Sequence, residues 1–123
     1  MTSGAEGRLL VACLCADWCS SCRDYRPTFD ALAARFAGAA DFAWIDIEDE
    51  ADALGDPEID NFPTLLVADA QALRFLGAVT PHAQTAERLV RSALGGELPP
   101  VAGADAALAD RVRSLLRSRG APE

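Results

Sequence analysis

The sequence predicts a single α/β domain with a mixed sheet of about four strands and an added helix at the C-terminus. Three observations predict this class. The chain has 123 residues, half of them hydrophobic, which is the size of one domain with a real core. Two apolar runs are separated by a segment of helical periodicity, as in a βαβ unit with parallel strands. Two later runs lie so close together that they can only form an antiparallel hairpin.

The first part of the chain carries the βαβ unit. Residues 8–16 form an almost continuous apolar run, typical of a strand buried on both faces. From Ser20 onward apolar side chains recur at steps of three and four, which predicts a helix with Pro27 inside it and Gly38 at its end. Residues 41–47 are rich in aromatic and branched side chains and predict the second strand.

The second part predicts a short helix, a hairpin and a long helix. Residues 51–54 have helical propensity, and residues 65–68 and 72–76 predict two strands joined by a short polar turn. Thr80 and Pro81 predict the start of the long helix, as N-cap and first helical residue.

The domain organisation follows from these elements. We assign residues 1–96 to the main domain, residues 97–103 to a linker and residues 104–119 to a C-terminal helical extension. Apolar side chains on one side of the last helix favour packing on the domain, and a segment that binds a partner is the alternative.

Charge excludes several classes of partner. Eleven basic residues stand against nineteen acidic ones, giving a formal net charge of −8. A protein that binds the phosphates of a nucleic acid or an anionic membrane surface needs a net positive charge. We therefore expect neither as a partner. Residues 10–13 match the box before a bacterial lipidated cysteine, but the segment upstream is polar and lacks the apolar stretch of a signal peptide. We therefore expect a cytoplasmic protein.

Four cysteines, Cys13, Cys15, Cys19 and Cys22, lie within ten residues and none occurs elsewhere. A secreted disulfide framework spreads its cysteines along the chain, so this clustering indicates redox chemistry or metal binding. A zinc or iron–sulfur site is the metal alternative. We predict no metal, because a strand buries Cys13 and Cys15 whereas Cys19 falls at the tip of a helix.

Position favours redox chemistry at the second pair. Cys19 falls at a helix N-terminus, where unpaired backbone N–H groups and the helix dipole favour a thiolate. Cys22 comes one turn later on the apolar stripe and is placed to resolve a mixed disulfide on Cys19. A pair of buried structural thiols is the alternative.

Three segments together resemble the thioredoxin family, namely ADWCSSCRDYRP, WIDIED and FPT. The resemblance covers roughly residues 8–95 and is more specific than a lone Cys-x-x-Cys. It implies a thioredoxin-like three-layer fold for the main domain. Only eighteen residues precede Cys19, so the family's usual first strand and helix are expected to be missing.

The resemblance also implies roles for individual residues. Cys19 would be the nucleophile and Cys22 the resolving cysteine. Four residues would shape the groove for a substrate strand, namely Trp18, Phe62, Pro63 and Gly77. The peptide bond before Pro63 would be cis.

Two departures from the family limit what can be transferred. Ser20 and Ser21 replace the Gly-Pro of thioredoxins between the cysteines, so the redox potential cannot be carried over. Cys13 stands where the family often has a buried aspartate. We favour core packing for Cys13 and Cys15, and an auxiliary redox role is the alternative.

These observations predict a thiol–disulfide oxidoreductase that reduces protein disulfides. We expect a monomer without cofactor or metal that receives its electrons from a separate reductase. One alternative is the opposite direction, a disulfide donor or isomerase, and another is a redox-inactive thioredoxin-like binding module.

Overall fold

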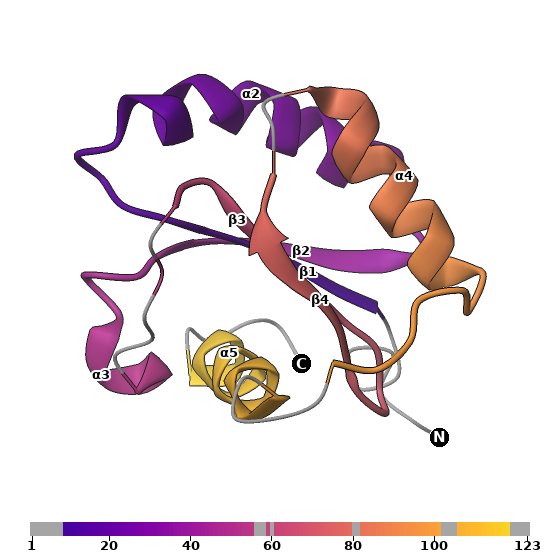
Figure 1. Ribbon diagram of the computed structural model, residues 1–123. Coiled ribbons are helices and arrows are strands. Elements are labelled where there is room, and N and C mark those ends of the chain that lie inside the picture. Colours follow the sequence, from indigo (N-terminus) through magenta and orange to yellow (C-terminus); the bar gives the residue numbers. More distant parts are fainter. Residues whose placement is uncertain (1–8, 56–58, 60, 80–81, 102–105, 119–123) are drawn as a thin grey trace.

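The computed structural model describes residues 9–55, 59, 61–79, 82–101 and 106–118. Within them, a four-stranded sheet lies between two layers of helices (Figure 1). The elements follow in the order β1 (Leu9–Cys15), α2 (Ser20–Arg35), β2 (Ala40–Asp46), α3 (Ala51–Leu54), β3 (Thr64–Ala68), β4 (Leu73–Ala78), α4 (Ala83–Leu94) and α5 (Ala106–Ser118). The predicted mixed α/β sheet with an added C-terminal helix is confirmed.

The sheet has the strand order β2-β1-β3-β4 and combines parallel and antiparallel pairs. β1 runs parallel to β2, with Cys15 opposite Asp46 at the end of both strands. β3 runs antiparallel to β1, with Leu14 opposite Thr64. The beginning of β3 therefore lies beside the end of β1, which gathers the segments before β3 and after β1 at one end of the sheet.

Helices α2 and α4 cover one face of the sheet (Figure 1). Alternate side chains of β1 point to this face, because successive residues of a strand face opposite sides. The buried members of this core are Leu9, Val11, Cys13, Cys15, Cys22, Tyr25, Phe29, Leu32, Phe36, Ala40, Leu65, Val67, Ala86, Val90 and Ala93. Three of the four cysteines are thus buried in this core, two from β1 and one from the first turn of α2.

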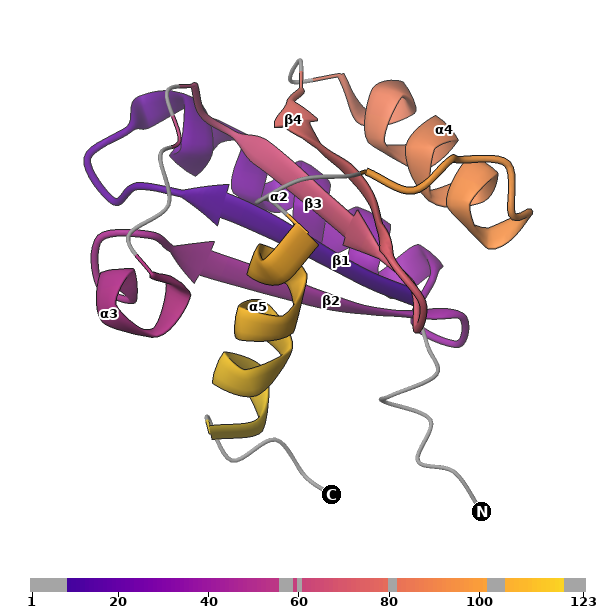
Figure 2. The same cartoon turned by 60° about the horizontal axis from the view of Figure 1, so that its bottom comes forward.

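Helices α3 and α5 cover the opposite face, and Figure 2 shows α5 lying across the sheet. The other alternating set of β1 side chains points here. The buried members are Leu10, Ala12, Leu14, Ala43, Ile45, Leu54, Leu66, Ala68, Leu73, Leu108, Ala109, Val112 and Leu115. The C-terminal helix is therefore part of a core and not an appendage.

Helix α2 ends earlier than the predicted Gly38. It passes through Pro27 and ends at Arg35, with Phe36 as C-cap. The Phe36 N–H donates to the Leu32 carbonyl. The Phe36 carbonyl accepts from the N–H groups of Ala39 and of Ala40, the first residue of β2. This turn leads the chain into β2 and ends the helix without a glycine.

The second half differs in detail from the prediction. α4 begins at Ala83 with His82 as N-cap, whereas Thr80 and Pro81, the predicted start, lie outside the described residues. In the predicted linker, the Leu98 carbonyl accepts from Arg74 at 3.2 Å and the Val101 N–H donates to Leu73 at 2.7 Å. This part of the linker is therefore held against β4.

Candidate functional site

Cys19 lies at the junction of β1 and α2, where the sequence placed it. It is the N-cap of α2, with extended backbone angles, and its N–H donates to the Ala16 carbonyl at 3.0 Å. No side chain caps the helix start. The Cys19 thiol is free and partly exposed. The helix thus directs uncapped backbone N–H groups toward the region of an accessible sulfur atom.

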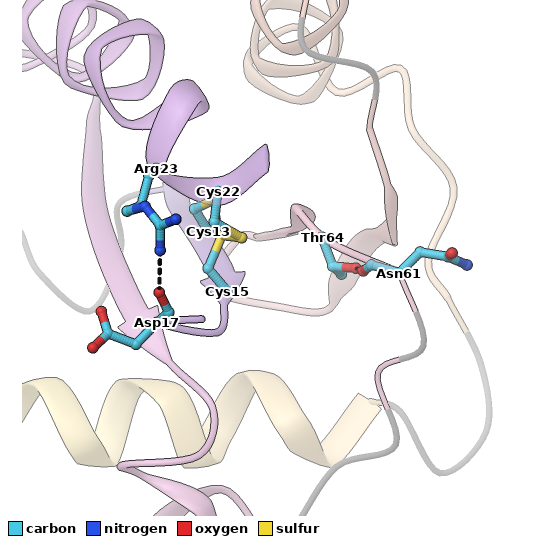
Figure 3. Close-up of a disulfide and its surroundings, with 7 residues drawn as sticks. All are labelled: Cys13, Cys15, Asp17, Cys22, Arg23, Asn61 and Thr64. Carbon is cyan, nitrogen blue, oxygen red and sulfur yellow. Dashed lines mark hydrogen bonds between the residues drawn. A yellow bond between two sulfur atoms is a disulfide. The ribbon is translucent and has the colours of Figure 1, made fainter. Parts of the chain in front are cut away.

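Cys22 is buried in the first turn of α2 and forms a disulfide with Cys15, the last residue of β1 (Figure 3). Their Cα atoms are 5.9 Å apart, a normal separation for a disulfide. Core packing was the favoured prediction for Cys15, an auxiliary redox role was the alternative, and this bond was not predicted. The signal was present, because Cys13 and Cys15 lie on the strand face that α2 covers.

Cys13 is a free thiol buried beside this disulfide. Its Sγ lies 3.6 Å from the Sγ of Cys15. Burial raises the pKa of the Cys13 thiol from 9.0 to about 12, and the charge of Arg26 offsets part of the rise. Cys13 is therefore a neutral thiol at physiological pH.

Tyr25 shares this buried region. Burial first, and then the neighbouring Cys13, raise the pKa of Tyr25 from 10.0 to about 12. The Tyr25 Oη is buried without a hydrogen-bond partner among the described residues. The surroundings of Cys13 are thus poor in groups that would stabilise a negative charge.

Trp18 and Phe62 lie together next to Cys19. Their rings meet edge to face with centroids 5.6 Å apart, although Trp18 is 62% exposed. The Trp18 Nε1–H donates to the Glu48 carboxylate at 2.8 Å, which orients the indole. Trp18 from the β1–α2 junction and Phe62 from the segment before β3 therefore form one aromatic surface. Glu48 from the segment after β2 holds the indole of this surface.

Pro63 lies directly before β3, and Gly77 lies within β4. The Phe62–Pro63 peptide bond is cis. Gly77 pairs with Leu65 between β4 and β3, and a Cβ at Gly77 would come within 3.2 Å of the Phe75 ring. The Thr64 hydroxyl donates to the Asn61 carbonyl at 2.6 Å and closes the turn before β3 (Figure 3).

A cavity of about 260 Å³ borders the site on the side of β2. Arg23 donates to the Asp17 carbonyl at 2.8 Å (Figure 3), and the Arg26 guanidinium lies 4.7 Å from the centre of the Trp44 ring. The lining residues are Ala16, Asp17, Cys22, Arg23, Arg26, Trp44 and Asp46. Carboxylates and guanidinium groups therefore share a hollow that reaches Cys22.

In the described part of the chain, no group of three or more His, Cys, Asp or Glu side chains could hold a metal ion. No helix among these residues is long and apolar enough to cross a membrane.

An α/β domain with a Cys-x-x-Cys pair at the start of a helix that follows a central strand has the architecture of a thiol–disulfide oxidoreductase. The family model for thioredoxin matches residues 3–91. The chain therefore belongs to the thioredoxin family. Membership of this family, together with the clustered cysteines, supports thiol–disulfide exchange as the general chemistry of the site.

Solved thioredoxin structures share the fold at low sequence identity. The germline-specific thioredoxin Deadhead of Drosophila melanogaster is 18% identical with a TM-score of 0.64, and the match covers 72% of this chain and 84% of that one. Thioredoxin from Trypanosoma brucei brucei is 19% identical with a TM-score of 0.63, covering 74% and 79%. Thioredoxin NaTrxh from Nicotiana alata is 21% identical with a TM-score of 0.62, covering 72% and 77%. No curated protein sequence matches the chain.

Proposed function

We propose that this protein reduces disulfide bonds of other proteins, with Cys19 as the nucleophile and Cys22 as the resolving cysteine. The observation that carries the proposal is the placement of Cys19. Its thiol is free and partly exposed at the N-cap of α2, and no side chain competes for the N–H groups there. A thiolate is the reactive form of cysteine in exchange reactions, and a helix N-terminus stabilises it.

The reaction takes two exchange steps. The Cys19 thiolate attacks one sulfur of the substrate disulfide, forms a mixed disulfide and releases the first substrate thiol. The Cys22 thiolate then attacks the Cys19 sulfur and releases the second. Residues three apart on a helix are neighbours, so Cys22 is positioned for this step. A separate reductase returns two electrons and two protons to the oxidised protein.

Protein substrates would dock beside Cys19 on the aromatic surface. Trp18 directly precedes Cys19 in the chain and its ring contacts that of Phe62, and large aromatic groups contribute strongly to binding. Pro63 and Gly77 would complete the groove, because Pro63 follows Phe62 in the chain and Gly77 pairs with Leu65, two residues after Pro63. In this proposal the protein acts as a monomer in the cytoplasm.

Reduction of insulin disulfides with dithiothreitol as electron donor tests the proposal. Wild type should accelerate the reaction, and Cys19→Ser should lower the rate to the background of dithiothreitol alone. The matched variant Cys22→Ser keeps the first step. Reduced beforehand and mixed with insulin in the absence of dithiothreitol, it should accumulate an adduct between Cys19 and insulin that added dithiothreitol releases. Equal rates for wild type and Cys19→Ser would overturn the assignment. Binding of insulin by wild type with neither an adduct nor turnover would favour a redox-inactive binding module.

A further inference from the structure

The structure pairs Cys22 with a partner that the reduction chemistry does not use. Reduction of a substrate by Cys19 and Cys22 ends with these two residues joined. Here Cys22 is instead bonded to Cys15, and Cys19 is a free thiol. Both bonds need the same Cys22 sulfur, so they are alternative oxidised states with the same number of electrons.

We propose, on the basis of the function above, that Cys15 is a third catalytic cysteine, which displaces Cys19 from Cys22 after each reduction. The protein oxidised by substrate would then carry a buried Cys15–Cys22 disulfide and a regenerated Cys19 thiol. The sequence favoured core packing for Cys15, with an auxiliary redox role as the alternative, and the proposal takes up that alternative.

The added step is an internal exchange. After Cys22 has released the substrate, the Cys15 thiolate attacks the Cys22 sulfur of the Cys19–Cys22 bond. A Cys15–Cys22 bond forms, the Cys19–Cys22 bond breaks, and the electron pair leaves on Cys19 as a thiolate. The proton lost by Cys15 passes to solvent or to Cys19. Over all steps one substrate disulfide becomes two thiols, and two protein thiols, Cys15 and Cys22, become one disulfide.

Burial and charge favour this direction of exchange. Cys15 and Cys22 are only 1% and 2% exposed, and their disulfide is an uncharged group in an apolar core. The displaced Cys19 is partly exposed at the start of α2, so the sulfur that leaves has access to solvent. A buried thiolate would lose its hydration.

Cys13 is placed to assist Cys15 as a positioning residue. A disulfide sulfur has no proton to donate, so in the 3.6 Å contact between the two sulfur atoms Cys13 is the donor. The same S–H can stabilise negative charge on Cys15 when the bond to Cys22 is absent. Cys13 itself stays protonated at neutral pH and does not act as a further nucleophile.

Disulfide mapping after turnover tests the proposal directly. Fully reduced wild type is oxidised with insulin, quenched in acid, alkylated and cleaved before aspartate. This cleavage separates residues 1–16, which hold Cys13 and Cys15, from residues 17–23, which hold Cys19 and Cys22. We expect the two peptides to be joined, with alkyl groups on Cys13 and Cys19. A closed loop within residues 17–23 as the sole disulfide would overturn the proposal.

Two matched variants on the same face of β1 provide the control. In oxidised native wild type and in Val11→Ala, Cys19 should react rapidly with N-ethylmaleimide. In Cys15→Ala, oxidation should hold Cys19 in a bond with Cys22, and labelling of Cys19 should be lost because a disulfide sulfur offers no thiolate. Equal labelling in the two variants would contradict a specific role of Cys15.

The Cys19→Ser variant separates this proposal from the proposed function. Oxidation of Cys15 and Cys22 by insulin should disappear in Cys19→Ser, because electrons reach the substrate only through Cys19. Insulin reduction by wild type that ends with a Cys19–Cys22 bond and two free thiols at Cys13 and Cys15 would overturn the internal exchange alone. Insulin reduction that survives Cys19→Ser would instead overturn the proposed function.

Discussion

At the residue scale, cysteine occurs in three different environments within ten residues of the chain. Cys19 is partly exposed at a helix start, Cys15 and Cys22 share a buried bond, and Cys13 is a buried thiol. Thiolate formation needs hydration or nearby positive charge. Cys19 is the one free thiol of the four that is partly exposed, so in the proposed reaction it is the cysteine that attacks the substrate.

The raised pKa of Cys13 makes stability depend on alkaline pH. The folded protein holds this proton to about pH 12, whereas an unfolded thiol loses it near pH 9. The contribution is thus complete below the unfolded pKa and is lost as pH rises toward the folded one. Between about pH 8 and about pH 10.5 wild type should lose about 2 kcal/mol more unfolding free energy than Cys13→Ala. Urea denaturation at both pH values measures this difference, and parallel losses would contradict it.

At the element scale, α5 completes the core on the second face of the sheet. Leu108 and Val112 are buried there, and Arg113 donates to the carbonyls of Ala68 and Asp69 at 3.3 and 3.2 Å. The apolar stripe of α5 is therefore occupied by the sheet and by α3. This arrangement favours a structural role over the alternative of a partner-binding segment.

Truncation of one α5 side chain should consequently unfold the whole domain more easily. Leu108 is 4% exposed, so Leu108→Ala removes buried methyl groups and leaves a cavity in the second core. We expect a loss of about 2–5 kcal/mol in unfolding free energy. Urea denaturation compares it with Ser114→Ala, an exposed position on the same helix, which should change stability by less than about 0.5 kcal/mol. Equal effects of the two variants would mean that α5 does not contribute to the core.

At the scale of the whole molecule, the Cys15–Cys22 bond ties the central strand to the helix that follows it. β1 contributes side chains to both cores and pairs with both β2 and β3. A constraint at its end therefore acts on the element around which the rest of the domain packs.

Reduction of this bond should lower the stability of the entire domain. The bond spans a sequence separation of seven residues, and closing so short a loop stabilises by about 2–3 kcal/mol in the chain-entropy model. Urea denaturation with and without a phosphine reductant should show this difference in wild type. Cys22→Ala, which can form neither alternative bond, should show none. A urea midpoint of wild type that is the same with and without the reductant would contradict the prediction.

Local patterns were sufficient for most of the fold. The apolar run at the start of the chain predicted β1, and the short helix Ala51–Leu54 was predicted with its observed bounds. The end of α2 was predicted wrongly at Gly38, because backbone hydrogen bonds around Phe36 turn the chain earlier. Helix ends depend on such contacts with the following strand, and hydrophobic periodicity does not report them.

The sequence by itself determined the alternation of strands and helices, the burial of Cys13 and Cys15 and the position of Cys19 at a helix start. These follow from periodicity and from neighbours along the chain. Only the tertiary structure decided that Cys22 meets Cys15. A disulfide requires two Cβ atoms within a few ångströms, and that distance depends on how α2 packs across the end of β1. The pairing is set by the packing of the helix on the strand, which cysteine spacing alone does not specify.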